Sequence, residues 1–486
     1  MQSLAASIPK PLGFPGGSWF IFYFDALSYF ALMLPFYRRP ITAKTVLLVL
    51  LVPLVATSVP ALLWLGWNAR PLNIAREFDI QTPAVRSANA HELYEKAFKE
   101  FDARKSGKPV ALIVDATADQ NVDEDAKKYP LGGKKNWLAK NRAGFQLFDQ
   151  ALKAEYYFPP VRSAQPGGDI EVPLSLYWLA RYASVECEVL AAAGQSEKAI
   201  HRGIDIWKMG LDGARGAPLT VSLQATKIEI YARRALDGEI AHLNGSQAAR
   251  AARRLEKLLE TRVSYETILR EERSAMLFQT KPRMEKEVRD QQRDQRIEDA
   301  YERGESYSYP DSDYGTAPEV RGPIINWHVR RINHGYERGM KSVIANANAP
   351  WSRHVTSLPT DLDPKIAEFM SVLNKSRFHL ARSQTLGNLV LARLALHAYL
   401  KDKGVYPPNL QTLAPKYLAK TPLDPFSDNQ ILRYRLTGKR YKLWSIGPDG
   451  RDDGARPALH PSPRKPSHRY NVAFDSTGDI VAQINK

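Results

Sequence analysis

The sequence predicts a mainly α-helical protein, anchored in a membrane, that ends in a small α+β module. Three observations lead to this fold class. A long uncharged run lies near the N-terminus, helical spacing dominates the middle, and a long C-terminal helix precedes alternating strand patterns. With 486 residues, 44% of them hydrophobic and 25% charged, the chain has the composition of a folded protein of two or three domains.

The uncharged run at Thr45–Trp67 predicts a transmembrane anchor. Its 23 residues are enough, at ~1.5 Å per residue, to cross a hydrocarbon core of ~30 Å. Pro53 and Pro60 lie inside the run and are tolerated in membrane helices. The alternative is a buried core helix.

Residues 1–44 form a separate N-terminal segment. Within it, Ser18–Tyr37 is rich in aromatic residues and is interrupted by Asp25. This stretch could be a second membrane span, an interfacial helix or an extension of the anchor, and the sequence leaves the three options open.

Positive charge before the anchor predicts the orientation of the chain. Arg38, Arg39 and Lys44 lie next to the run, and such charges stay on the cytoplasmic side of a span. We therefore expect a bacterial inner-membrane protein with the bulk of the chain extracytoplasmic, on the periplasmic side. The single cysteine, Cys187, lies among apolar residues and excludes an intrachain disulfide, which favours a buried thiol.

Residues 87–350 are predicted to form a mainly helical domain. Ser87–Lys105 has apolar residues at helical spacing, and a strand-like run with a polar loop follows it. The helices Pro173–Ala193 and Gln195–Gly213 are joined at Gly194 by a turn similar to that of tetratricopeptide-like helical hairpins. No second copy follows at that period, so we expect a repeat-like hairpin layer and not a repeat array.

Further helices are expected in the second half of this domain. They cover Pro218–Ile240, Ser246 to about Phe278, and Ile324–Asn348. The charged segment Lys281–Arg303 predicts a solvated helix, and a flexible loop is expected at about 305–322.

Residues 374–486 are predicted to form the α+β module. Asn374–Lys403 reads as one long helix that ends at Gly404. A strand hairpin with its turn near Thr437 and Gly438 follows, and a last hairpin with its turn at residues 476–479 could extend the sheet.

The order of landmarks in this module resembles the soluble domain of the major pseudopilin of type II secretion systems. The resemblance covers about Ser383–Ala455. Its landmarks are a Gly-x-Tyr-Pro helix end, a short second helix, an Asp-Pro-aromatic turn, a tyrosine-rich strand and a Ser-x-Gly-x-Asp-Gly loop; these are Gly404, Tyr406, Pro407, Leu410–Leu418, Asp424, Pro425, Phe426, Tyr434, Ser445, Gly447, Asp449 and Gly450. A pilin carries a glutamate near its processed N-terminus, and this chain has Ser18 at the corresponding position. We therefore expect a borrowed module and not a fibre subunit.

The resemblance implies a calcium site in the last loop. In that family, aspartate side chains and backbone carbonyls supply the oxygen ligands that calcium needs. Asp449 matches the family's position, and Asp452 or Asp453 would have to replace the second acid. The alternative is an acidic surface turn without metal.

The C-terminal region is strongly basic. From Lys375 to Lys486 there are 19 Lys and Arg against 8 Asp and no Glu, a net charge of 19 − 8 = +11. Besides the lipid bilayer, this charge predicts an acidic protein or polysaccharide partner. No recognisable motif supports binding to nucleic acid.

Catalytic motifs are absent from the sequence. It has no nucleophile elbow, P-loop or dinucleotide fingerprint, and "HELYE" at 91–95 has glutamate where a zinc peptidase needs its second histidine. We therefore expect an envelope protein that acts by binding or scaffolding, with an accessory role in a secretion or pilus-like system as one option. The alternative is an envelope hydrolase in which Glu271 or Glu272 meets His328 or His334 between helices.

Overall fold

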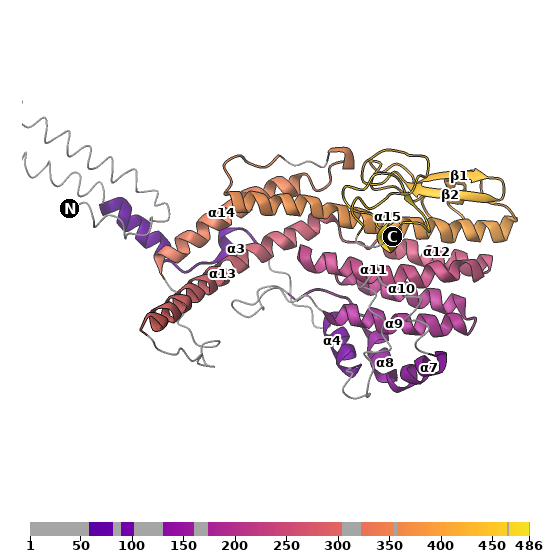
Figure 1. The fold of residues 1–486 in the computed structure, drawn as a ribbon, viewed down its shortest axis with the longest axis horizontal. Coiled ribbons are helices and arrows are strands. Elements are labelled where there is room, and N and C mark those ends of the chain that lie inside the picture. The colour runs from indigo at the N-terminus through magenta and orange to yellow at the C-terminus, as the bar shows by residue number, and fades with distance from the viewer. Residues whose placement is uncertain are drawn as a thin grey trace, which may run out of the picture. The chain divides into compact units, whose positions relative to one another are not determined.

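The computed structural model describes the chain in seven stretches, which are residues 58–80, 89–101, 130–159, 174–303, 322–353, 357–463 and 466–485. These residues are mainly helical, with a small three-stranded sheet near the C-terminus (Figure 1), and the prediction is confirmed at this level. The chain divides into two compact units. One comprises Met1–Leu72 with Val320–His328, and the other Asn73–Glu319 with Val329–Lys486.

The predicted transmembrane anchor at Thr45–Trp67 is corrected by the structure. Among the described residues, no helix is both long and apolar enough to cross a membrane. The described part of the predicted span, residues 58–67, is helical, and this helix continues to residue 69. Residues 45–57, and with them the stretch Ser18–Tyr37 and the whole of 1–44, lie outside the described residues.

The smaller unit is held by contacts between residues 58–72 and the start of α14 (Pro323–Ala345). The rings of Trp64 and Trp327 lie 6.2 Å apart. The Asn326 side chain donates a hydrogen bond of 2.8 Å to the carbonyl of Asn68.

Helices stacked on one another form most of the larger unit (Figure 1). In chain order they are α3 (Ile74–Glu77), α4 (Ala90–Glu100), α7 (Leu131–Lys140), α8 (Arg142–Ala151), α9 (Leu174–Ala192), α10 (Ser196–Asp212), α11 (Leu219–Glu239) and α12 (Gly245–Leu259). A 3-10 turn, Ile240–His242, follows α11. One hydrophobic core runs through all of these helices except α3, and its largest fully buried side chains include Trp207, Tyr94 and Phe101.

The predicted hairpin around Gly194 is present as α9 and α10. Gly194 has a positive φ of 69°, which glycine adopts without strain. Close packing continues between α10 and α11, because a Cβ at Gly203 would lie 2.4 Å from Leu236 Cδ1. The glycine therefore allows these two helices to pack closely.

The single helix predicted from Ser246 to about Phe278 is wrong. The structure has two helices there, since α12 ends at Leu259 and α13 spans Tyr265–Glu302. Two interactions favour the break, one local and one tertiary. Ser264 accepts a hydrogen bond from the backbone N–H of Thr267, as an N-cap does, and Arg262 turns inward to a buried carboxylate. Helix α13 includes the charged segment predicted to be helical, and the loop at about 305–322 lies outside the described residues apart from Gly322.

Helix α15 (Pro364–Lys403) is the long C-terminal helix, and it begins before the predicted Asn374. Asp363 caps its start by accepting from Lys365 N at 2.9 Å, and Pro364 occupies the first turn. Gly404 ends it in the left-handed conformation, as expected. The N-terminal part of α15 packs in a cluster with α13 and α14, and its C-terminal part packs in the main core.

The sheet consists of β1 (Arg433–Thr437), β2 (Arg440–Ser445) and β3 (Ile480–Val481), all antiparallel in the order β1-β2-β3. The predicted hairpin turn is confirmed, because Thr437 pairs with Arg440 across Gly438. Residues 480–481 extend the sheet by pairing with β2. The pairing around residues 476–479 differs from the predicted last hairpin, since Thr477 bridges to Leu459. Leu432 and Leu443 belong to the same core as the helices of the middle region.

Candidate functional site

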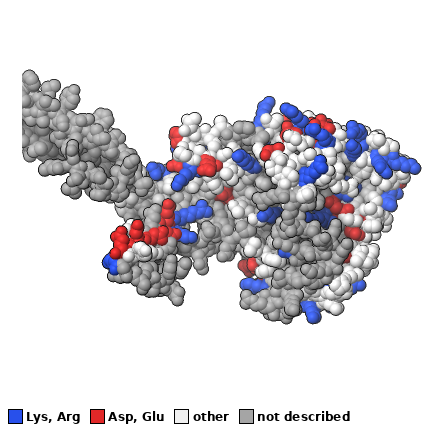
Figure 2. Space-filling view, in the orientation of Figure 1, with Lys and Arg blue, Asp and Glu red and all other residues white. Residues whose placement is uncertain are grey.

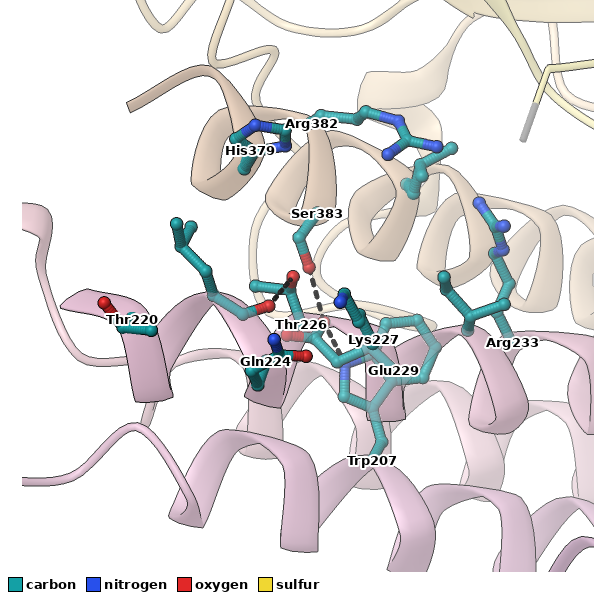
Figure 3. A pocket seen from close by; sticks show the side chains of 13 residues that line it. Trp207, Thr220, Gln224, Thr226, Lys227, Glu229, Arg233, His379, Arg382 and Ser383 are labelled. Atoms are coloured by element: carbon teal, nitrogen blue, oxygen red, sulfur yellow. Dashed lines mark hydrogen bonds between the residues drawn. The ribbon is translucent and has the colours of Figure 1, made fainter. Parts of the chain in front are cut away.

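A pocket of about 470 Å³ lies between α11 and α15 (Figure 3). We call it the α11–α15 pocket. Its lining side chains come from those two helices and from Trp207 of α10; they are Trp207, Thr220, Leu223, Gln224, Thr226, Lys227, Glu229, Ile230, Arg233, His379, Arg382, Ser383 and Leu386. Thr220 and Lys227 are exposed at its rim, so the pocket opens to solvent.

A buried ion pair forms the floor of the pocket. Both carboxylate oxygens of Glu229 accept from Arg262, at 2.9 Å and 2.7 Å. The indole N–H of Trp207 and the hydroxyl of Ser383 each donate to Glu229 Oε2 at 2.8 Å. Because charge-assisted, two-pronged pairs hold their geometry well, this network fixes α10, α11 and α15 around the pocket.

The carboxylate of Glu229 is therefore fully engaged. Its negative charge is balanced by Arg262, and its oxygens accept four hydrogen bonds. The Ser383 hydroxyl donates its hydrogen bond to the same carboxylate, so it is not poised as a nucleophile toward His379. The arrangement suits binding better than bond cleavage.

The remaining charged side chains of the pocket are basic. Lys227 and Arg233 come from α11, and His379 and Arg382 come from α15 (Figure 3). Desolvation lowers the pKa of His379, and the neighbouring charges of Arg382 and Lys227 lower it further. The pocket consequently carries an excess of positive charge and favours an anion.

Arg233 has an unusual position in this pocket. The residue is only 9% exposed, and its Nη1 atom is buried without a hydrogen-bond partner. Burial lowers the pKa of Arg233, and the nearby carboxylate of Asp237 offsets this only in part. A buried guanidinium without a partner costs free energy, and an anionic ligand would supply the missing acceptor.

Apolar side chains complete the lining. Leu223, Ile230 and Leu386 are partly exposed in it, beside the buried ring of Trp207. An anion with an apolar body fits this combination better than a small inorganic ion.

Each of the three predicted calcium ligands has a different hydrogen-bond or ion-pair partner in the structure. Asp449 accepts from Gly478 N at 2.8 Å, and Asp452 accepts from the Trp444 indole at 2.9 Å. Asp453 pairs with Arg456 at 3.0 Å. Over the described ranges no group of three His, Cys, Asp or Glu could hold a metal ion. Calcium binding by this loop stays a prediction, which a calcium titration followed by thermal melting would test.

The acids and histidines of the hydrolase alternative have other partners. Glu271 accepts from the Tyr157 hydroxyl at 3.3 Å, and Glu272 accepts from Leu219 N at 2.8 Å. Burial raises the pKa of both carboxyls. His334 packs on the ring of Phe78 and His328 on that of Trp327. No described contact joins one of these acids to one of these histidines.

Sequence reasoning missed the α11–α15 pocket. One signal was present, because Glu229 stands four residues after Ala225 and three before Ala232, at the spacing of a buried helix face. A carboxylate on that face predicts a buried partner. The sequence did not show that the partner would be Arg262 or that α15 would pack opposite.

Comparison with known proteins gives no relative. The chain matches no protein-family model, no curated protein and no solved structure.

Proposed function

We propose that this chain is a binding protein whose α11–α15 pocket holds an anionic organic ligand. The observation that carries the proposal is the buried guanidinium of Arg233, which lines the pocket without a partner of its own among the described residues. Lys227 and Arg382 add positive charge, and Leu223 and Ile230 offer apolar surface.

The proposal is tested by measuring decanoate binding to the full chain by calorimetry, with inorganic phosphate as the comparison anion. We expect decanoate to bind, and Arg233→Met to weaken its binding about 10- to 100-fold, the effect of losing a hydrogen bond to a charged group. Arg142→Met, which removes an exposed arginine of α8 outside the pocket, should leave binding unchanged.

Two results would overturn anion binding by the pocket. One is that neither anion binds to the wild-type chain. The other is that Arg233→Met and Arg142→Met have the same effect on decanoate binding. Tighter binding of phosphate than of decanoate would favour a phosphate site and contradict the organic ligand.

The basic C-terminal region supports a second candidate, contact with an acidic polysaccharide or protein. Figure 2 shows Lys and Arg gathered over the region of β1 and β2, where Arg435, Lys439, Arg440 and Lys442 are exposed. Retention on immobilised heparin tests this candidate. Lys439→Glu with Lys442→Glu should elute at lower salt than the matched variant Lys198→Glu with Lys257→Glu, and equal elution would contradict it.

The pseudopilin-like plan of residues 383–455 is also retained as a proposal. Two of its landmarks meet in the core, because the buried carboxylate of Asp424 accepts from the Ser445 hydroxyl at 2.7 Å and from Ile446 N at 2.9 Å. Tyr434 donates to the carbonyl of Pro407 at 2.8 Å. An experimental structure whose chain path through these landmarks departs from that of a pseudopilin would contradict the proposal.

A further inference from the structure

A second, smaller cavity of about 110 Å³ lies beside the α11–α15 pocket. We call it the side cavity. Its lining comes from the following turns of α11 and α15 and from the C-terminal segment; the residues are Arg233, Arg234, Asp237, Leu386, Leu389, Val390, Arg393, Ala482, Gln483 and Asn485. Arg233 and Leu386 line both cavities, so these two side chains lie between the two cavities.

The side cavity is also positively charged. The cavity contains three arginines, Arg233, Arg234 and Arg393, and one acid, Asp237, which is paired with the buried Arg393. Arg234 is exposed, and none of the described contacts gives its guanidinium a hydrogen bond or ion pair. A volume of about 110 Å³ has room for a carboxylate group but not for a large ligand.

Apolar surface separates the two groups of cations. Ile230 and Leu386 lie in the α11–α15 pocket, and Leu389 and Val390 lie in the side cavity. Lys227 and Arg234 are seven residues apart on α11, which corresponds to about 10 Å along the helix at ~1.5 Å per residue. The combined site therefore has cations in both cavities, with Arg233 at their junction and apolar side chains beside it.

We propose that the ligand is an elongated organic dianion, such as an α,ω-dicarboxylate, with one carboxylate in the α11–α15 pocket and the other at Arg234. This inference rests on the proposed function, because it requires that the pocket binds an anion. Arg233, which lines both cavities, contacts the ligand where it passes from one to the other.

The experiment compares decanedioate with decanoate on the full chain by calorimetry. The two probes have the same carbon chain and differ in one terminal carboxylate. We expect decanedioate to bind at least about tenfold tighter than decanoate, because the second carboxylate meets a charged donor. Arg234→Met should abolish this difference, and the exposed control Arg142→Met should preserve it.

The outcomes separate this inference from the proposed function. If both probes bind with equal affinity and both depend on Arg233, the anion pocket stands and the two-ended ligand is refuted. If decanedioate binds tighter but Arg234→Met does not reduce the difference, the assignment of the second end is refuted. If neither probe binds, both proposals fall. Because Arg234 is exposed, its replacement is not expected to unfold the chain, and thermal melting of the variant checks this.

Discussion

Trp207 on α10 donates its indole N–H to the carboxylate of Glu229 on α11, at 2.8 Å. Both residues are buried, at 1% and 5% exposure. The same carboxylate accepts hydrogen bonds from Arg262 and Ser383. One acid therefore connects α10, α11, α15 and the link between α12 and α13. The walls of the pocket are therefore fixed by the hydrogen bonds that form its floor.

Removing the charge of Glu229 should destabilise the chain strongly. Glu229→Gln leaves the guanidinium of Arg262 without its counter-ion in a largely buried place, which costs about 3–5 kcal/mol of unfolding free energy. Chemical denaturation measures the change. The double variant Glu229→Gln with Arg262→Met should recover part of the loss, whereas a single variant within about 0.5 kcal/mol of wild type would show that the pair contributes little.

Arg233→Met should have the opposite effect on stability. Without ligand, Arg233 is a buried charge that lacks a hydrogen-bond partner, and its replacement by an apolar side chain of similar length is expected to stabilise the chain by about 1–3 kcal/mol. Chemical denaturation of the ligand-free chain provides the measurement. A loss of more than about 1 kcal/mol would mean that Arg233 supports the fold rather than a ligand.

The contact between α10 and α11 can be tested with two glycines. Gly203→Ala should destabilise the chain by about 1–3 kcal/mol, since its Cβ would lie 2.4 Å from Leu236 Cδ1. Gly238→Ala, on α11, has no atom within 4 Å of the new Cβ and should be neutral or stabilising by up to about 1 kcal/mol. Thermal melting of the two variants decides the matter, and equal shifts would contradict the close approach.

Cys187 should be unreactive in the folded chain. The residue is buried in α9, and burial raises the pKa of its thiol far above the ordinary range. At pH 8 we expect labelling by a disulfide reagent at least about 100-fold slower in the native chain than in guanidinium. Similar rates in the two conditions would refute this packing of α9.

Asp479 should give the chain a pH-dependent stability. Burial, with the charges of Asp452 and Asp453, raises the pKa of Asp479 to about 6, whereas an unfolded aspartate has a pKa of about 3.9. The folded state therefore binds more protons between about pH 4 and pH 6, and this contribution to stability is lost as the pH rises through that range. Asp479→Asn should flatten this part of the melting profile, and the exposed control Asp475→Asn should not. Parallel profiles for Asp479→Asn and the wild-type chain would refute the shifted pKa.

Several elements could be predicted from the sequence because their signals are local. Gly194 marks the turn between α9 and α10, Gly404 marks the end of α15, and Gly438 marks the turn between β1 and β2. In each case a positive φ is required at one position, and glycine supplies it. The break between α12 and α13 was missed because apolar spacing continues across it, while the cause is a tertiary interaction of Arg262.

The pocket could not be predicted for a related reason. Its two walls, at residues 220–233 and 379–386, are separated by about 150 residues of sequence, and no local pattern indicates that they pack together. The predicted calcium loop shows the opposite case, in which closeness in sequence does not bring side chains to one shared site. Its acids are close in sequence, but each carboxylate has a different partner, such as Gly478 N for Asp449.

Helix α15 passes through two hydrophobic clusters of the larger unit. Met370 and Leu373 belong to the cluster with α13 and α14, and Leu389 and Leu396 belong to the main core. The pocket residues 379–386 lie on the stretch between them. A fragment that begins at residue 374 would therefore lack the first part of this helix. It would also expose the α15 surface that α11 and α12 cover in the full chain. The folded unit cannot be divided along this helix, and we expect limited proteolysis to spare α15 until the whole unit opens.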